Sequence, residues 1–226
     1  MHCLICYKHL QPDTTWSTLF TSAEKQICAD CESQFERLIE VSNHHCQICM
    51  RPLKESLNLC GDCFAWRERL DGRDPLKRNM SIFTYNEFMK EIMTLFKYRG
   101  DYELIYVFKE EIKQTFVSLK DFAIVPIPLS EERFNERGFN QAEAIASLAG
   151  EKILNLLKRT SSEKQSKKTK QERIFSTNPF ELTQLPPKKV LLVDDLYTTG
   201  TTLRQAAQLL TDSGAEVIQS FTLIRS

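Results

Sequence analysis

All cysteines of this 226-residue chain lie before residue 64, and each belongs to a Cys-x-x-Cys pair. The four pairs are Cys3/Cys6, Cys28/Cys31, Cys46/Cys49 and Cys60/Cys63. Two thiolates three positions apart on a tight turn can bind one metal ion, and two such turns complete the tetrahedral sulfur shell that Zn²⁺ prefers. A shell of four thiolates has no open position for water. We therefore expect two structural zinc sites that hold the fold and do no chemistry.

The spacing alone leaves the grouping of the pairs open. In a sequential arrangement the first two pairs bind one ion and the last two bind the other, whereas an interleaved arrangement exchanges partners. A disulfide framework is the main alternative to zinc. It is disfavoured because the first residues lack the basic region, apolar stretch and cleavage site of a secretory signal, and a reducing cytosol keeps thiols free. We therefore expect a cytoplasmic protein.

The chain divides where the cysteines end. Residues 71–80 are polar and contain Gly72 and Pro75, a composition typical of a linker. We predict a double zinc-binding domain over residues 1–70, a linker over 71–80 and a second domain over 81–226. Because structural zinc binding is coupled to folding, Cys46→Ser should unfold the first domain and leave the second able to bind phosphates.

The second domain alternates strand-like and helix-like patterns, and no apolar run approaches the roughly 18 residues that cross a bilayer, so we expect no membrane insertion. The expected elements are a strand over 81–85, helices over 88–96 and 104–116, a strand over 122–128, a helix over 141–157, a strand over 190–193, a helix over 201–211 and a strand over 217–224. Such alternation predicts an α/β fold with a parallel sheet and crossover helices. In such sheets the ligand lies beyond the carboxyl ends of the strands.

Two carboxylates and a hydroxyl-rich loop follow the expected strand at 190–193. The residues of interest are Asp194, Asp195, Thr198, Thr199, Gly200, Thr201 and Thr202. Amide groups at a helix start, together with threonine hydroxyls, can cradle a phosphate, and the glycine lets the backbone approach closely. The acids can accept hydrogen bonds from a sugar diol and would favour a nearby Mg²⁺ with its water shell. The alternative is a solvated turn in which the acids only cap the helix.

The stretch from Val190 to Thr202 also resembles the phosphoribosyl-diphosphate (PRPP) motif of the type I phosphoribosyltransferases. That resemblance implies a type I phosphoribosyltransferase-like parallel sheet. It also implies that Asp194 and Asp195 face the ribose 2′ and 3′ hydroxyls, and that residues 198–202 hold the 5′-phosphate. Mg²⁺ would accompany the diphosphate.

The resemblance narrows when the rest of the chain is included. Similarity to the ComF family of phosphoribosyltransferase-like late-competence proteins is carried by the cysteine-rich head, residues 97–101 (Lys-Tyr-Arg-Gly-Asp), residues 125–130 (Val-Pro-Ile-Pro-Leu-Ser), Arg133 and residues 137–142 (Arg-Gly-Phe-Asn-Gln-Ala). Membership implies a role in DNA uptake during natural transformation. The implied partners are single-stranded DNA and the competence helicase of the DNA-uptake machinery.

The phosphoribosyltransferase resemblance also suggests which residues would act in catalysis. In that fold the loop after the strand at Val125 contacts diphosphate, where Arg133 and Arg137 could serve as bidentate partners. The candidate catalytic residues are therefore Asp194, Asp195, Arg133 and Arg137. The alternative for the arginines is a solvated surface balanced by neighbouring glutamates.

A basic segment over 158–173 carries seven cations and two acids, although the whole chain is neutral with 30 basic and 30 acidic residues. By resemblance this segment is the hood that closes over the reacting diphosphate, whose charge its lysines would stabilise. It would equally suit a nucleic-acid backbone, with Phe175 and Phe180 stacking on bases. The expected DNA contacts are Lys164, Lys167, Lys168 and Lys170. A solvated loop is the third interpretation.

Two functions follow from these observations. The first is a cytoplasmic late-competence protein that binds PRPP with Mg²⁺ and single-stranded DNA. The alternative is an active phosphoribosyltransferase, a pentosyl-transferring enzyme without a DNA role. No motif identifies the nitrogen acceptor that this second function requires.

Overall fold

Apolar residues at alternate positions of the central strands give the sheet two buried faces. Along strand β5 (Lys189–Tyr197), Leu191 and Val193 join one hydrophobic cluster, while Val190 and Leu192 join the other. Successive side chains of a strand point to opposite faces, so this run must be covered on both sides. These elements belong to a computed structural model that describes residues 1–10, 26–54, 57–98, 100–150, 153–160 and 178–226.

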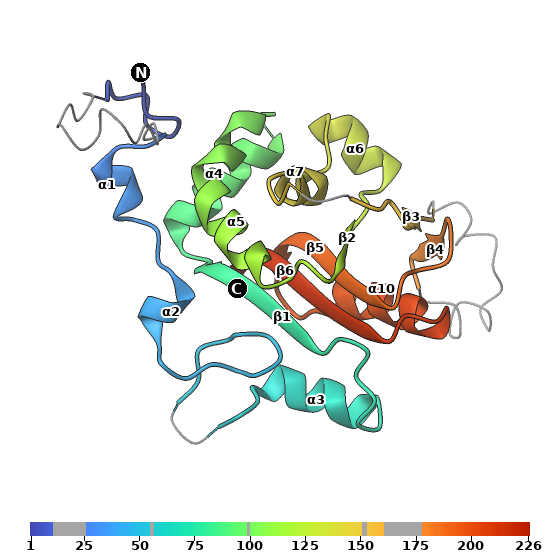
Figure 1. Ribbon diagram of the computed structural model, residues 1–226. Coiled ribbons are helices and arrows are strands. Elements are labelled where there is room, and N and C mark those ends of the chain that lie inside the picture. Colours follow the sequence, from blue (N-terminus) through green and yellow to red (C-terminus); the bar gives the residue numbers. More distant parts are fainter. Residues whose placement is uncertain (11–25, 55–56, 99, 151–152, 161–177) are drawn as a thin grey trace.

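The sheet has the order β1-β6-β5-β2, and every neighbouring pair is parallel. Its other strands are β1 (Arg78–Thr84), β2 (Ala123–Pro126) and β6 (Val217–Arg225). A separate two-stranded antiparallel sheet joins β3 (Leu157–Arg159) to β4 (Phe180–Leu182). The parallel α/β sheet predicted from the sequence is confirmed (Figure 1).

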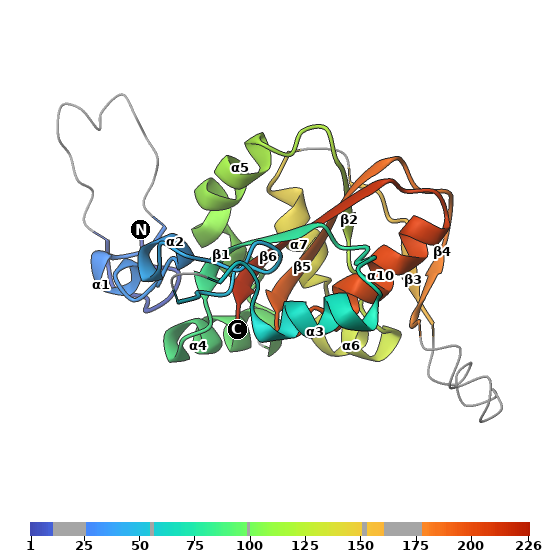
Figure 2. The same cartoon turned by 90° about the horizontal axis from the view of Figure 1, so that it is seen from below.

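Helices cover both faces of the sheet (Figure 1). One face packs against α4 (Glu87–Tyr98), the 3₁₀ helix η1 (Tyr102–Phe108), α5 (Lys109–Val117) and α7 (Gln141–Ser147). The other face packs against α10 (Thr201–Asp212) and the cysteines from Cys46 to Cys63. Figure 2 shows α10 close to α3 (Gly61–Arg69), which begins between the last two cysteines. The short helices α1 (Ala29–Glu32), α2 (Leu38–Val41) and α6 (Glu131–Arg137) complete the described elements.

Helices α4 and α10 and strand β6 lie where the sequence predicts them, but the predicted helix over 141–157 is wrong beyond its first two turns. Helix α7 ends at Ser147, and Gly150 adopts a left-handed φ of 73° that an α-helix cannot continue through. The chain then turns into β3. The predicted helix over 104–116 is also divided, into η1 and α5.

The predicted linker contributes to the core. Strand β1 begins at Arg78, and both Leu76 and Asn79 are buried. The Asn79 side-chain amide donates to Ser81 Oγ at 2.7 Å, and its carbonyl oxygen accepts from Ser220 Oγ on β6 at 2.8 Å. This polar network joins β1 to β6 inside the sheet. The division into domains over 1–70, 71–80 and 81–226 stays a prediction. Among the described residues, no helix has the length and apolarity needed to cross a membrane.

Replacing Asn79 with leucine should lower the free energy of unfolding by about 1–3 kcal/mol, because the buried Ser220 hydroxyl loses its acceptor. Urea denaturation of the purified variant measures the loss. Adding Ser220→Ala should recover part of it, since removing both partners leaves no unsatisfied group. A single variant as stable as the wild type would contradict this account of the network.

Candidate functional site

The carboxyl end of β5 is open on one edge. The β2 register ends at the pair Pro126–Val193, whereas β6 accompanies β5 as far as Tyr197. Asp194 and Asp195 therefore lie within the strand and not after it, on a stretch that β2 no longer pairs with. This edge of the sheet, which we call the crevice, is where the sequence predicts a ligand.

The two acids occupy different electrostatic environments. Asp194 Oδ1 accepts a hydrogen bond from the Asp195 amide at 2.9 Å, and burial, reinforced by the neighbouring Asp195 carboxylate, raises the pKa of Asp194 well above its ordinary value. Asp195 forms an ion pair with Lys97, which α4 brings to this edge. The sequence assigned no role to Lys97. Perturbed carboxylates in a crevice are typical of a functional site.

The phosphate loop, residues 198–202, has little freedom in its backbone. Gly200 has a left-handed φ of 75°, and a Cβ atom there would lie 2.2 Å from the Tyr197 hydroxyl and 2.4 Å from Arg204 Nη1. Any other residue would therefore be strained and crowded. The Thr199 and Thr201 hydroxyls lie 2.9 Å apart and are exposed to solvent at the start of α10. Close backbone approach and exposed hydroxyls suit a bound phosphate.

The two predicted arginines have different surroundings. Arg133 lies close enough to Arg159 of β3 for its positive charge to affect Arg159. Burial first, and then Arg133, lowers the pKa of Arg159, while Asp194 opposes the shift. Like charges held near each other beside a crevice favour an anion between them. Arg137 instead donates to Gln141 Oε1 at 2.7 Å and lies over the Tyr98 ring.

Arg159 is, like Lys97, a residue to which the sequence assigns no role at the site, since within the basic segment it is only one of seven cations. It is the last residue of β3, and its guanidinium lies over the Phe180 ring. Phe180 is 4% exposed, so the expectation that it stacks on bases is wrong. The predicted DNA contacts Lys164, Lys167, Lys168 and Lys170 lie outside the described residues, as does Phe175.

The cysteines form two clusters in which all four sulfur atoms lie within 4.8 Å of one another. One contains Cys3, Cys6, Cys28 and Cys31, and the other contains Cys46, Cys49, Cys60 and Cys63. The grouping is therefore sequential. Hydrogen bonds with the thiols of Cys49 and then Cys63 lower the pKa of Cys46, whereas hydrogen bonds with Cys46 and then Cys49 raise the pKa of Cys63. Four thiolates can coexist at these distances only around a cation, so each cluster could hold a zinc ion.

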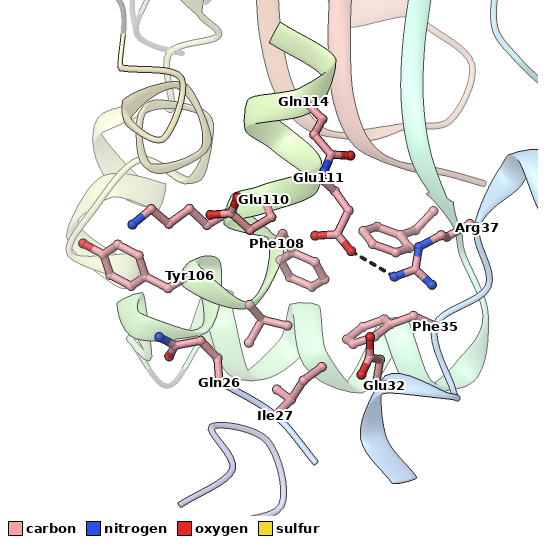
Figure 3. A pocket seen from close by; sticks show the side chains of 13 residues that line it. Gln26, Ile27, Glu32, Phe35, Arg37, Tyr106, Phe108, Glu110, Glu111 and Gln114 are labelled. Carbon is pink, nitrogen blue, oxygen red and sulfur yellow. Dashed lines mark hydrogen bonds and ion pairs between the residues drawn. The ribbon is translucent and has the colours of Figure 1, made fainter. Parts of the chain in front are cut away.

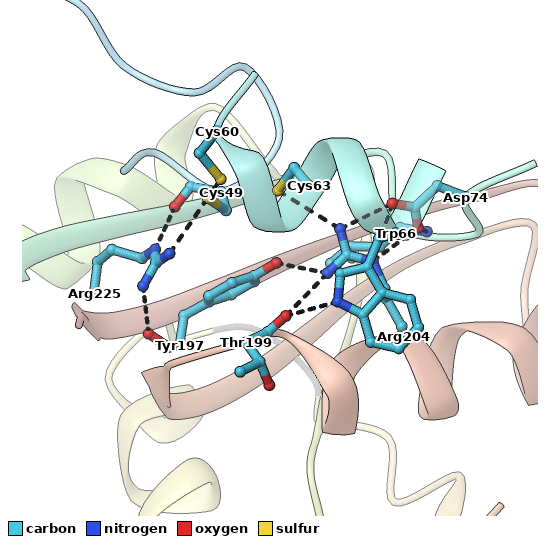
Figure 4. Close-up of polar contacts among 10 residues, drawn as sticks. Cys49, Cys60, Cys63, Trp66, Asp74, Tyr197, Thr199, Arg204 and Arg225 are labelled. Carbon is cyan, nitrogen blue, oxygen red and sulfur yellow. Dashed lines mark hydrogen bonds and ion pairs between the residues drawn. The ribbon is translucent and has the colours of Figure 1, made fainter. Parts of the chain in front are cut away.

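The second cluster is part of the main hydrophobic core. All four of its cysteines are buried, and they pack with residues of β5 and α10. Arg225 at the end of β6 donates to the Cys49 carbonyl oxygen at 3.1 Å and contacts the Cys49 sulfur at 3.6 Å (Figure 4). The independence of the two domains that the sequence suggests does not fit these contacts.

An open pocket of about 760 Å³ lies elsewhere, between the segment around Gln26–Arg37 and the residues of η1 and α5 (Figure 3). Its rim includes the ion pair of Arg37 with Glu111 at 2.9 Å. None of the site residues predicted from the sequence lines it. The pocket marks the seam where the N-terminal segment meets the helices.

Comparison with known proteins agrees with the fold. Residues 135–226 match the phosphoribosyl transferase domain family, so the crevice belongs to a phosphoribosyltransferase-type domain. The whole chain is 41% identical over 232 residues to competence protein ComFC of Bacillus subtilis (strain 168), an alignment that covers 99% of this chain and 95% of that protein. The chain belongs to the ComF family of phosphoribosyltransferase-like competence proteins.

Two further relatives extend the comparison. Competence protein ComFC of Streptococcus pneumoniae (strain ATCC BAA-255 / R6) is 35% identical over 229 residues, and the alignment covers 100% of both chains. DNA utilization protein YhgH of Escherichia coli (strain K12) is 25% identical over 218 residues, with 88% of this chain and 90% of that protein covered.

Purified protein should contain two zinc ions per chain, one for each cysteine cluster. Elemental analysis measures the content. Cys6→Ser removes an exposed ligand of the first cluster and should reduce the content to about one ion while the main domain stays folded, because metal binding in a small site is coupled to local folding.

Cys46→Ser provides the contrasting variant. It removes a ligand that is buried in the main core, so it should also lower the thermal unfolding temperature of the whole protein. A wild-type content of one zinc ion would contradict the two-site prediction. Equal effects of the two substitutions on unfolding would contradict the placement of the second cluster in the core.

Proposed function

We propose that the protein is a late-competence protein needed for DNA uptake in natural transformation, and that it binds PRPP with Mg²⁺ and single-stranded DNA in the cytoplasm. The observation that carries the proposal is the pair of half-buried acids, Asp194 and Asp195, beside the phosphate loop at the open edge of β5. The competence and DNA-utilization names of the relatives support the biological role.

Each part of PRPP has matching groups in the crevice. The phosphate loop offers backbone amides and the Thr199 and Thr201 hydroxyls for the 5′-phosphate. Asp194 and Asp195 can accept hydrogen bonds from the ribose hydroxyls. Arg133 on α6 and Arg159 on β3, whose charges interact with each other, can supply positive charge for the diphosphate, and the charge of Arg159 also interacts with Asp194. Mg²⁺ would neutralise part of the diphosphate charge when bound.

DNA binding would rest on charge and not on base recognition. Lys164, Lys167, Lys168 and Lys170 lie in the segment that follows β3, whose last residue, Arg159, is near the crevice. A cluster of lysines in a neutral protein attracts a phosphate backbone with little sequence preference. We propose the competence helicase as the partner that delivers the strand.

Phosphoribosyl transfer is the second candidate, and the observation that favours it is the Arg133–Arg159 arrangement beside Asp194. In such a transfer the bond from ribose C1 to the diphosphate oxygen breaks, a bond from C1 to an acceptor nitrogen forms, and the nitrogen loses a proton to solvent. Arginine charge would stabilise the departing diphosphate. Diphosphate release that depends on an added nitrogen acceptor would support turnover. If no acceptor causes diphosphate release, the protein binds PRPP without turning it over.

Replacing Asp194 and Asp195 together with alanine should weaken PRPP binding in the presence of Mg²⁺ by well over tenfold. Each hydrogen bond to a charged group contributes roughly 1.5–3 kcal/mol, and about 1.4 kcal/mol corresponds to tenfold in affinity. Isothermal titration calorimetry measures the change. Equal affinities of the wild type and the double variant would refute the assignment of the crevice.

Asp194→Asn tests the electrostatic environment of Asp194 through folding stability, separately from PRPP binding. The folded-state pKa of Asp194 is raised, so the folded protein holds a proton that the unfolded chain releases, and stability falls as pH rises above about 4. An asparagine at position 194 does not ionise, so the variant does not lose this stability as the pH rises. The variant should therefore be more stable than the wild type at pH 7, by roughly 0.5–2 kcal/mol, with the gain vanishing toward pH 4. Urea denaturation at the two pH values measures it.

Single-stranded DNA affinity should fall with salt with a log–log slope of roughly −2.8, since each of about four neutralised phosphates contributes about −0.7. Replacing Lys164, Lys167, Lys168 and Lys170 with glutamine should flatten this slope and leave the zinc content unchanged. Fluorescence anisotropy with a labelled oligonucleotide over a range of salt concentrations measures both affinity and slope.

A control variant carries the same change in net charge elsewhere. Lys90, Lys113, Lys120 and Lys188 are exposed, and replacing them with glutamine should leave DNA affinity nearly as in the wild type. If both quadruple variants bind DNA equally well, the basic segment is not the DNA contact. The zinc-cluster surface around Arg51, Lys54 and Arg67 would then be the next candidate.

A further inference from the structure

Helix α3 contacts the phosphate loop directly. Trp66 lies three residues after Cys63, and its Nε1 donates a hydrogen bond of 3.0 Å to the Thr199 carbonyl oxygen (Figure 4). The donor thus comes from the helix that carries a ligand of the second cysteine cluster, and the acceptor belongs to the phosphate loop. The two residues are separated by 133 positions in the chain.

Arg204 also contacts both the phosphate loop and the second cysteine cluster. It is 2% exposed, and its Nη1 donates to the Tyr197 hydroxyl at 2.7 Å and contacts the Thr199 carbonyl oxygen at 3.5 Å. Nη2 contacts the Cys63 sulfur at 3.8 Å and donates to Asp74 Oδ2 at 2.9 Å. One rigid, planar guanidinium therefore contacts both a cluster sulfur and the phosphate loop.

These contacts determine which way the loop amides point. A trans peptide is planar, so its carbonyl oxygen and the following N–H lie on opposite sides. The Thr199 carbonyl oxygen is held toward α3, and the Gly200 N–H must therefore point away from α3. Gly200 has no room for even a Cβ against Tyr197 and Arg204, which prevents the loop from sinking toward the cluster. Contacts on the side of the loop that faces α3 therefore hold it in a shape that can accept an anion on its other side.

We propose that Trp66 and Arg204 are positioning residues for the phosphate loop, and that they link metal occupancy of the second cysteine cluster to phosphate binding on the loop. The inference rests on the proposed function, because it takes the loop as the site of the PRPP 5′-phosphate. Linkage is reciprocal. If an intact cluster strengthens ligand binding, bound ligand must strengthen metal retention by the same factor. The link is short, since Arg204 contacts both Cys63 and the loop.

The experiment uses the full chain and PRPP with Mg²⁺ as the probe. The chain has two tryptophans, Trp16 and Trp66, so Trp16→Phe leaves Trp66 as the only tryptophan whose emission is followed. PRPP titration should change the Trp66 emission, because the indole N–H is bonded to the loop that the ligand contacts. In parallel, zinc release to a colorimetric chelator is followed with and without PRPP, and PRPP should slow the release.

Trp66→Phe in the full chain removes the indole donor and keeps an aromatic ring. It should weaken PRPP binding in calorimetry by roughly three- to tenfold, the effect of one neutral hydrogen bond, and should reduce the protection of zinc by PRPP, since the Arg204 link remains. Arg204 is too deeply buried for a clean replacement. Tyr197→Phe, which removes only the hydroxyl that accepts from Arg204, is the second variant and should weaken binding in the same direction.

Phe64→Ala is the matched control, because Phe64 lies on the same helix and is 57% exposed. It should leave PRPP affinity and zinc protection unchanged. If the wild type binds PRPP but Trp66→Phe and Tyr197→Phe bind it equally well and retain zinc protection, the linkage is wrong and the proposed function stands. If the wild type shows no PRPP binding, both are overturned.

Discussion

The buried guanidinium of Arg204 joins the end of β5 to the segment that runs from the second cysteine cluster to the start of the sheet. Its partners are Asp74 before β1, Tyr197 at the end of β5 and Cys63 in the second cysteine cluster. A buried charge is tolerated only when it is paired and hydrogen-bonded, and Asp74, itself nearly buried, supplies the opposite charge. The phosphate loop, the cluster and the start of the sheet therefore depend on one another for their positions.

At the crevice, in contrast to Arg204, charges of the same sign lie near one another and do not stabilise the fold. Asp194 is half-buried beside a second carboxylate, and Arg159 lies close enough to interact with the charges of both Arg133 and Asp194. Each arrangement costs stability when no ligand is present, and a phosphorylated, hydroxyl-rich ligand with Mg²⁺ would offset that cost. A local cost in stability of this kind is expected at a ligand-binding site.

Prediction succeeded where the signal is local and failed where a single residue overrides it. The strand at 190–193 and the helix at 201–211 follow from short-range apolar patterns, and both are present. The helix expected over 141–157 continues the same kind of pattern, but Gly150 takes a left-handed conformation and the chain turns into β3. That turn brings Arg159 to the crevice, which no periodicity could have indicated.

The sequence by itself determined the chemistry of the parts, because ligand type and spacing are local properties. Four Cys-x-x-Cys pairs, two adjacent acids and a glycine among threonines suffice to predict thiolate metal sites and a phosphate loop. Only the tertiary structure decided how the parts combine. It grouped the pairs sequentially, buried the second cluster in the main core and placed Trp66 on the loop. The last two of these arrangements join residues more than a hundred positions apart, and they form only when the sheet closes over a shared core.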